Sequence, residues 1–190
     1  MKISTEPIGS IPRPGYLTDA MRAFAINEIK KDELAGLFDR ALEETIRLFE
    51  ATGSPVITDG EQTKPSFATY PVHGLQTLSP NGVVIPFADG HTRQLPKITS
   101  GPFRYQHYAG DYLKKAKSLT GLPVKQAVIS ASALSLLYPQ EGIDGYTRDQ
   151  FIADLLNAAE ADIRNCLNAG AYNVQIDFTE ARLSVKLDPS

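Results

Sequence analysis

The stretch "GSPVITDGE", from Gly53 to Glu61, decides the fold of this chain. A proline precedes a short apolar run, Val56-Ile57, and the polar residues Asp59-Gly60-Glu61 follow it. A compact apolar run bounded by turn residues is typical of a strand buried in a sheet. Gly53 is a stop signal for a preceding helix. The stretch therefore predicts a helix followed directly by a buried strand.

A long amphipathic helix is expected immediately before this strand, over residues 30–53. Its apolar side chains recur at helical spacing and form one stripe, made of Leu34, Leu37, Phe38, Ala41, Leu42, Thr45 and Leu48. A shorter helix with the same kind of spacing is expected over residues 16–26. Two helices that bury one face each need a sheet or a further helix to pack against.

Strand and helix signals alternate along the rest of the chain. Further strands are expected over residues 2–9, 122–130 and 172–177, and further helices over residues 106–121 and 147–170. Thr147 is the expected N-cap of the last helix, and Gly170 is its expected end. This alternation predicts an α/β fold with a parallel sheet.

The middle of the chain, residues 65–103, has a different composition. It is rich in proline, glycine and threonine, and "ADGHTR", residues 88–93, places an Asp-Gly turn signal between β-rich flanks. We interpret this region as an inserted β-hairpin or a long functional loop.

The number of predicted strand–helix units is too small for a complete barrel. The pattern gives about four strand–helix units in a single domain over residues 1–190, whereas a closed (β/α)₈ barrel needs about eight. The chain is therefore either a small open α/β domain or half of a barrel. A half barrel would leave strand edges and apolar faces uncovered, and these favour self-association.

Composition excludes several classes of protein. The formal net charge is -3 over 190 residues, which argues against a nucleic-acid partner, because phosphate binding requires a basic face. No apolar run reaches the roughly 18 residues that span a membrane, and the N-terminus does not resemble a secretion signal. The single cysteine, Cys166, is expected in the apolar core, and a cytoplasmic location is the simplest prediction.

Polar residues follow each of the four predicted strands. In α/β barrels, the ends of the strands carry the chemistry. Backbone N–H groups at Ile8-Gly9-Ser10 are suited to a carboxylate, and the carboxylates of Glu61 and Asp177 are suited to an ammonium group. With Ser130 at the third strand end, these residues predict a pocket for a zwitterion such as an amino acid. The alternative is that they only form turns, where glycine, serine and aspartate are common.

Four segments resemble the catalytic C-terminal barrel of cobalamin-independent methionine synthase, in that family's order. They are "PIGSIPRP" (7–14), "VITDGEQTKPSF" (56–67), "SLTGLPVKQAVIS" (118–130) and "AGAYNVQIDFTEARL" (169–183). The resemblance covers nearly the whole chain and is weakest in the hairpin region. It implies a (β/α)₈ barrel of the TIM type, of which this chain is the N-terminal half.

The resemblance implies a methyltransferase of methionine biosynthesis that moves a methyl group from a methylated folate to the thiol of homocysteine. Ile8, Gly9 and Ser10 would hold the homocysteine carboxylate, and Glu61 and Asp177 its ammonium group. In that family a zinc ion keeps the sulfur as a thiolate.

The chain also departs from the family pattern. The family's zinc ligands (a His-x-Cys pair, a Glu and a further Cys) belong to the second half of the barrel and match nothing here, so the metal ligands are expected outside this chain. We therefore expect a fragment that is inactive alone. Phe178 replaces the acidic residue that follows the aspartate, and the sequence has no tryptophan to pack against a folate, so a methyl-corrinoid donor stays open.

Two other interpretations stay open. One is a catalytically incomplete half barrel that binds an amino acid or needs a partner. The other is a related zinc-dependent thiol alkyltransferase with a different acceptor.

For the other candidate residues we expect a structural role, and a functional role is the alternative. Lys64, Arg93 and Lys97 are expected in a solvated loop, with contacts to a folate glutamate as the alternative. His73 is expected to be structural rather than a proton carrier. Asp59 and Glu61 would lie on one face of an extended strand, which is the arrangement of a general acid/base pair.

Overall fold

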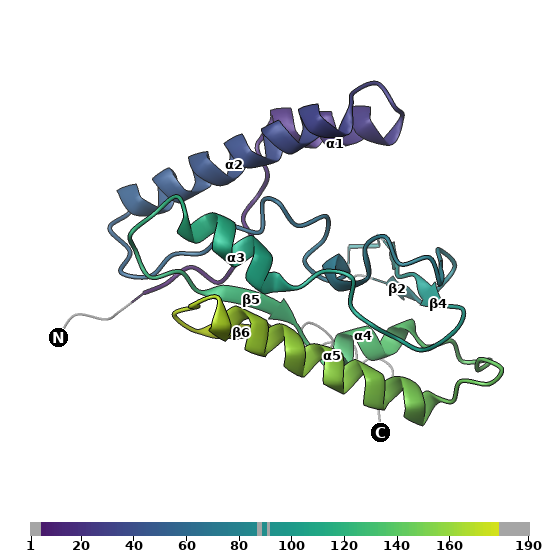
Figure 1. Ribbon diagram of the computed structural model, residues 1–190. Coiled ribbons are helices and arrows are strands. Elements are labelled where there is room, and N and C mark those ends of the chain that lie inside the picture. Colours follow the sequence, from purple (N-terminus) through teal and green to yellow (C-terminus); the bar gives the residue numbers. More distant parts are fainter. Residues whose placement is uncertain (1–4, 87–88, 91, 179–190) are drawn as a thin grey trace. The chain divides into compact units, whose positions relative to one another are not determined.

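The computed structural model describes residues 5–86, 89–90 and 92–178 (Figure 1). The chain divides into two compact units. Unit 1 comprises Met1–Phe67, Ala109–Val128 and Ile163–Gln175, and unit 2 comprises Ala68–Tyr108, Ile129–Asp162 and Ile176–Ser190. Each unit is described separately below.

The α-helices and 3-10 helices lie between short strands. The helices are α1 Gly15–Ala25, α2 Lys31–Ala51, η1 Tyr70–Val72, α3 Ala109–Lys117, α4 Ala131–Leu134, η2 Ser135–Leu137 and α5 Arg148–Asn168. The strands are β1 Leu78–Ser79, β2 Val84–Pro86, β3 Thr92–Gln94, β4 Lys97–Ile98, β5 Gln126–Ile129 and β6 Val174–Asp177. The α/β class is confirmed. In the described residues, no helix combines the length and apolar character needed to cross a membrane.

Helix α2 carries the core of unit 1. Its buried residues Leu42 and Ile46 pack with Ile57, Leu113 and Val124. Another part of its buried face packs against α1 in a second apolar cluster, formed by Leu17, Ala20, Leu34 and Ala41. The predicted stripe is therefore correct in its centre, but Leu48 is 61% exposed.

The two strands predicted in the N-terminal part of unit 1, over residues 2–9 and 54–61, form few or no ladder hydrogen bonds within the described residues. Residues 5–14 form no strand, and residues 2–4 of the predicted segment lie outside the described residues. The segment 54–61 keeps one parallel bridge, between Ile57 and Val124. Prolines 7, 12 and 14 cannot donate to a ladder, which explains why the first segment pairs only sparsely.

Side chains and single backbone bonds nevertheless hold these segments in parallel-sheet order. The Thr58 hydroxyl donates to the Gly9 carbonyl at 3.1 Å, and the Ile11 N–H donates to the Gly60 carbonyl at 3.2 Å. The Ile57 N–H donates to the Pro123 carbonyl at 3.0 Å. The segment containing Ile57 therefore lies between the N-terminal segment and the segment leading into β5.

Strands β5 and β6 pair in a two-stranded sheet. The Gln126 N–H donates to the Asn173 carbonyl in unit 1, and the Ser130 N–H donates to the Asp177 carbonyl in unit 2. The two bonds have the same sequence offset, so the strands are parallel, as predicted. The number of strand–helix units of a barrel is not established by these strands, and the barrel stays a prediction.

Unit 2 contains the predicted hairpin. Strands β2 and β3 are antiparallel, with Val84 opposite Gln94, and β1 pairs with β4 in the same antiparallel sense. Gly90 of the expected Asp-Gly turn has a φ of 89°. A core of aromatic rings supports the unit, with the ring centroids of Phe103 and Phe151 5.1 Å apart.

The start and end of α5 agree with the sequence prediction. The Gln150 N–H donates to the Thr147 hydroxyl at 3.2 Å, and the Thr147 N–H donates to the Gln150 side chain at 2.8 Å, which is a reciprocal N-terminal cap. At the other end, Gly170 has a φ of 80°, a left-handed conformation that glycine adopts without steric strain because it lacks a Cβ.

The glycine of the deciding stretch gives a stability prediction. Gly60 has a φ of 61°, and a Cβ there would lie 2.7 Å from Thr45 Cγ2 and 3.0 Å from Ile11 Cγ1. We expect Gly60→Ala to lower the free energy of unfolding by about 2–4 kcal/mol, because strain and overpacking add. Thermal unfolding should show a fall in Tm of about 5–10 °C.

Gly121→Ala is the matched control, because no heavy atom lies within 4 Å of its Cβ position. Its effect should stay within about 0.5 kcal/mol. Equal effects of the two substitutions would contradict this description of the Gly60 turn.

Candidate functional site

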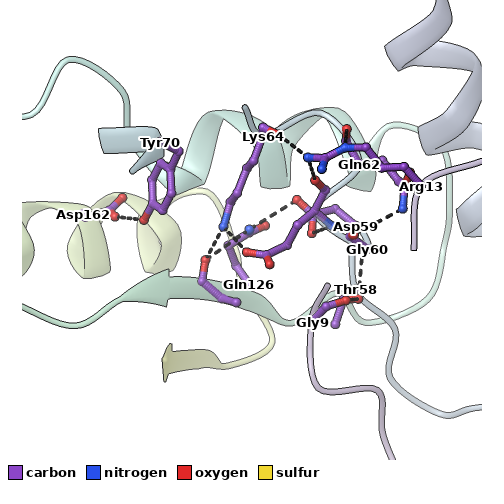
Figure 2. A network of polar contacts seen from close by, with 12 residues as sticks. Gly9, Arg13, Thr58, Asp59, Gly60, Gln62, Lys64, Tyr70, Gln126 and Asp162 are labelled. Atoms are coloured by element: carbon purple, nitrogen blue, oxygen red, sulfur yellow. Dashed lines mark hydrogen bonds and ion pairs between the residues drawn. The ribbon is translucent and has the colours of Figure 1, made fainter. Parts of the chain in front are cut away.

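A buried ion pair lies at the centre of unit 1. The Lys64 side chain is 0% exposed and the Glu61 side chain 3%, and Lys64 Nζ lies 2.7 Å from Glu61 Oε1. The same ammonium donates to the Ala127 carbonyl of β5 at 2.8 Å (Figure 2). Ions removed from water need both a countercharge and hydrogen-bond partners, and here Lys64 has both.

The ion pair is formed within a tight turn, residues 59–64. The Glu61 N–H donates to Asp59 Oδ1 at 2.9 Å, and Glu61 has a φ of 54°, which is unusual for a residue with a side chain. Asp59 Oδ2 accepts from the Gln126 amide at 3.3 Å. The predicted extended strand with Asp59 and Glu61 on one face is therefore wrong. The Asp59 carboxylate holds the turn, as aspartate commonly does.

Arg13, from the N-terminal segment, donates hydrogen bonds to the backbone carbonyls of this turn. Its Nε donates to the Gln62 carbonyl at 3.3 Å, and its Nη2 donates to the carbonyls of Glu61, at 3.2 Å, and Lys64. Burial lowers the pKa of Arg13, and the nearby negative charge of Glu61 opposes that shift.

The predicted carboxylate cradle, Ile8-Gly9-Ser10, lies beside this turn. In the described residues, the backbone N–H groups of Gly9 and Ser10 donate to no protein acceptor. Gly9 lies against β5, since a Cβ there would be 3.4 Å from the Ala127 Cβ. Ile8 is 77% exposed. Backbone N–H donors therefore lie on a segment that is bonded to the turn carrying the buried Glu61.

The other two predicted site residues belong to unit 2. Ser130 is buried, and its hydroxyl accepts from the Ala133 N–H at 3.2 Å, which makes it the N-cap of α4. Its own N–H donates to the Asp177 carbonyl at 3.2 Å, so the two strand ends meet as predicted. A joint role of these residues with Glu61 stays a prediction.

The sequence did not indicate the places of Lys64 and Arg13 in unit 1. The expectation that Lys64 lies in a solvated loop is wrong, because its side chain is fully buried. The spacing of Glu61 and Lys64, three residues apart, is the signal that could have found the pair. No comparable signal links Arg13 to a turn roughly fifty residues later, because that contact depends on the fold.

Unit 2 has an open pocket of about 760 Å³. Its lining includes Lys97, Glu141 and Arg148. Lys97 pairs with Glu141 there rather than lying in a solvated loop without partners. In the same unit, the rings of His73 and His107 lie 6.0 Å apart, and His91 lies outside the described residues.

Among the described residues, no group of three or more His, Cys, Asp or Glu side chains could hold a metal ion. Cys166 is 0% exposed, which confirms its predicted place in the core. The part of the chain that the structure describes therefore does not fit the zinc that the family resemblance implies.

Comparison with known proteins supports the resemblance. The chain is 24% identical over 176 residues to a methionine synthase of Sulfolobus acidocaldarius, and the match covers 92% of this chain and 51% of the relative. It is 25% identical over 177 residues to a 5-methyltetrahydropteroyltriglutamate–homocysteine methyltransferase of Nitrosomonas europaea, covering 92% of this chain and 23% of the relative. No protein-family model matches the chain.

A solved structure shows the same fold. It is a B12-independent methionine synthase of Shewanella sp. W3-18-1 in complex with selenomethionine, with a TM-score of 0.73 and 18% identity. The match covers 97% of this chain and 55% of that one. The chain thus spans about half the length of this structure and of the Sulfolobus relative, and the similarity to methionine synthases predicted from the sequence is confirmed.

The buried ion pair gives a second stability prediction. Lys64→Met keeps the length of the side chain but removes the charge that compensates Glu61. We expect a loss of about 3–5 kcal/mol in the free energy of unfolding, measured by denaturant titration, because breaking a buried pair leaves a buried charge. Combining it with Glu61→Gln should cost less than the sum of the two single changes.

Lys114→Met is the matched control. Lys114 pairs with Asp111 at the same three-residue spacing, but both side chains are more than half exposed. Its effect should be about 0–1 kcal/mol. The assignment fails if Lys64→Met is as mild as this surface substitution.

Proposed function

We propose that this chain supplies the homocysteine-binding part of a cobalamin-independent methyltransferase. The reaction is the transfer of a methyl group from a methylated folate to the thiol of homocysteine, as the name of the Nitrosomonas relative states for that protein. The support is a similarity that covers 92% of this chain in both relatives. Since the chain spans only part of those relatives, the whole activity is a proposal.

The observation that carries the proposal is the joining of two segments in unit 1. Hydrogen bonds between Thr58 and Gly9, and between Ile11 and Gly60, hold the N–H donors of Gly9 and Ser10 beside the Glu61 turn. Homocysteine carries a carboxylate and an ammonium on one carbon atom, so a site for it needs these two groups at short range.

In this proposal, each end of the zwitterion has its own partner. The N–H groups of the Ile8–Ser10 segment bind the substrate carboxylate, and Glu61 binds the ammonium. Asp177 and Ser130, which are joined by a backbone hydrogen bond in unit 2, remain candidate site residues on sequence grounds. The selenomethionine bound to the Shewanella relative has the same α-amino-acid part, which supports an amino-acid site in this fold.

The Lys64 ion pair is compatible with this role. A carboxylate can accept several hydrogen bonds, so a bond from Lys64 to Oε1 and a bond from a substrate ammonium are chemically compatible.

The unit 2 pocket supports the folate donor. Folates carry glutamate carboxylates, and the lining of this pocket of about 760 Å³ holds Arg148 and Lys97, the latter paired with Glu141. A contact with a folate glutamate is the alternative role expected for Lys97 from the sequence.

Binding measurements with Glu61→Gln test the proposal. Isothermal titration calorimetry should show homocysteine binding at least about tenfold weaker than to the unmodified chain, because a charge-assisted contact is worth about 1.5–3 kcal/mol. The affinity for 4-mercaptobutanoate, which lacks the ammonium group, should change less than about twofold, since Glu61 has nothing to bind in it.

Asp111→Asn serves as the control, because it removes an exposed carboxylate of the same unit. It should leave both affinities unchanged. The proposal is contradicted if the unmodified chain does not bind homocysteine, or if Glu61→Gln weakens both ligands equally.

A further inference from the structure

We propose that Arg13 is a positioning residue that fixes the Glu61 carboxylate for recognition of the substrate ammonium, an inference that rests on the proposed function. Arg13 would not touch the substrate. It acts through the backbone of the turn that carries Glu61.

Arg13 bonds to the backbone of the Glu61 turn and not to the Glu61 carboxylate. A guanidinium next to a glutamate normally pairs with its carboxylate, and the two groups here are close enough for Glu61 to act electrostatically on Arg13. Yet in the described part of the chain, every hydrogen bond of Arg13 goes to a backbone carbonyl, those of Glu61, Gln62 and Lys64. Arg13 therefore holds the main chain of the turn and leaves the carboxylate to other partners.

The backbone at Glu61 needs such support. Its φ of 54° lies in the left-handed region, which costs a residue with a Cβ about 1–2 kcal/mol. Conformations of this kind persist only where the surroundings hold them. Asp59 holds the Glu61 N–H from within the turn, and Arg13 holds the carbonyl on the other side of the same residue from a separate segment.

The conformation of Glu61 decides where its side chain points. With the φ reversed, the Cα–Cβ bond would take another direction, and the carboxylate would leave the position where Lys64 Nζ lies 2.7 Å from it. Arg13 also links the Glu61 turn to the cradle segment Ile8-Gly9-Ser10, because it lies only three residues after Ser10. Among the described residues, the hydrogen bonds of Arg13 nevertheless go to the turn alone, so its effect is expected at the ammonium end of the zwitterion.

Lysine could not replace Arg13 in this role. The guanidinium is a rigid fork with several N–H donors in one plane, whereas an ammonium is a single point charge on a flexible stem. Arg13→Lys therefore keeps the charge and removes the ability to hold several carbonyls at once.

A double-mutant cycle tests the inference. Affinities for homocysteine and 4-mercaptobutanoate are measured by calorimetry on the full chain and on Arg13→Lys, Glu61→Gln and the double variant. Arg13→Lys should weaken homocysteine binding about tenfold and leave 4-mercaptobutanoate within about twofold. In the Glu61→Gln background, Arg13→Lys should add less than about a twofold loss, because its effect passes through Glu61.

Arg13→Met is a second variant that keeps part of the side chain's length, and Arg22→Lys is the control, since Arg22 pairs with Asp19 on the exposed surface of α1. All titrations are run well below the Tm of the least stable variant, so that only folded protein is compared.

The outcomes separate this inference from the proposed function. If Glu61→Gln weakens homocysteine and Arg13→Lys adds an equal loss on top of it, or weakens both ligands alike, Arg13 is merely structural and the inference is overturned. The inference is also overturned if Arg13→Lys and Arg13→Met bind homocysteine like the unmodified chain. If Glu61→Gln itself has no effect on homocysteine, the proposed function fails first.

Discussion

The ion pair between Glu61 and Lys64 is the interaction on which the arrangement of unit 1 depends. Burying two oppositely charged side chains away from water is costly, and the cost is offset only when geometry and hydrogen bonding are good. Here Lys64 has a carboxylate at 2.7 Å and the β5 carbonyl of Ala127 at 2.8 Å. The need of Lys64 for both partners fixes the turn of residues 59–64 against β5. That turn also holds the N-terminal segment, through the bond of Ile11 to Gly60 and the bonds of Arg13.

Much of the fold could be predicted because its signals are local. The periodicity of α2 and α5, the cap at Thr147 and the Asp-Gly turn of the hairpin each depend on residues close in sequence. The first two strands were overestimated, because an apolar or β-compatible run does not reveal how few of its N–H groups can pair. Residues 5–14 contain three prolines, and only Ile57 of the second segment forms a bridge. The short helix α4 was missed, since its N-cap Ser130 was interpreted as a site residue.

The candidate site was predicted in its residue types more than in its geometry. Gly9, Ser10 and Glu61 lie on neighbouring segments, as the convergence of strand ends implied. The left-handed turn at Glu61, the burial of Lys64 and the contacts of Arg13 could not be predicted, because each depends on side chains brought together by tertiary structure. The same contacts make the site more specific than a set of strand ends, since they give the Glu61 carboxylate one orientation.

The most direct measurement of the central claim is a crystal structure of this chain with homocysteine bound. We predict that the substrate carboxylate lies on the N–H groups of Gly9 and Ser10 and the substrate ammonium on the Glu61 carboxylate, with Lys64 still paired to Glu61. A ligand bound elsewhere, or one whose ammonium does not contact Glu61, would contradict it.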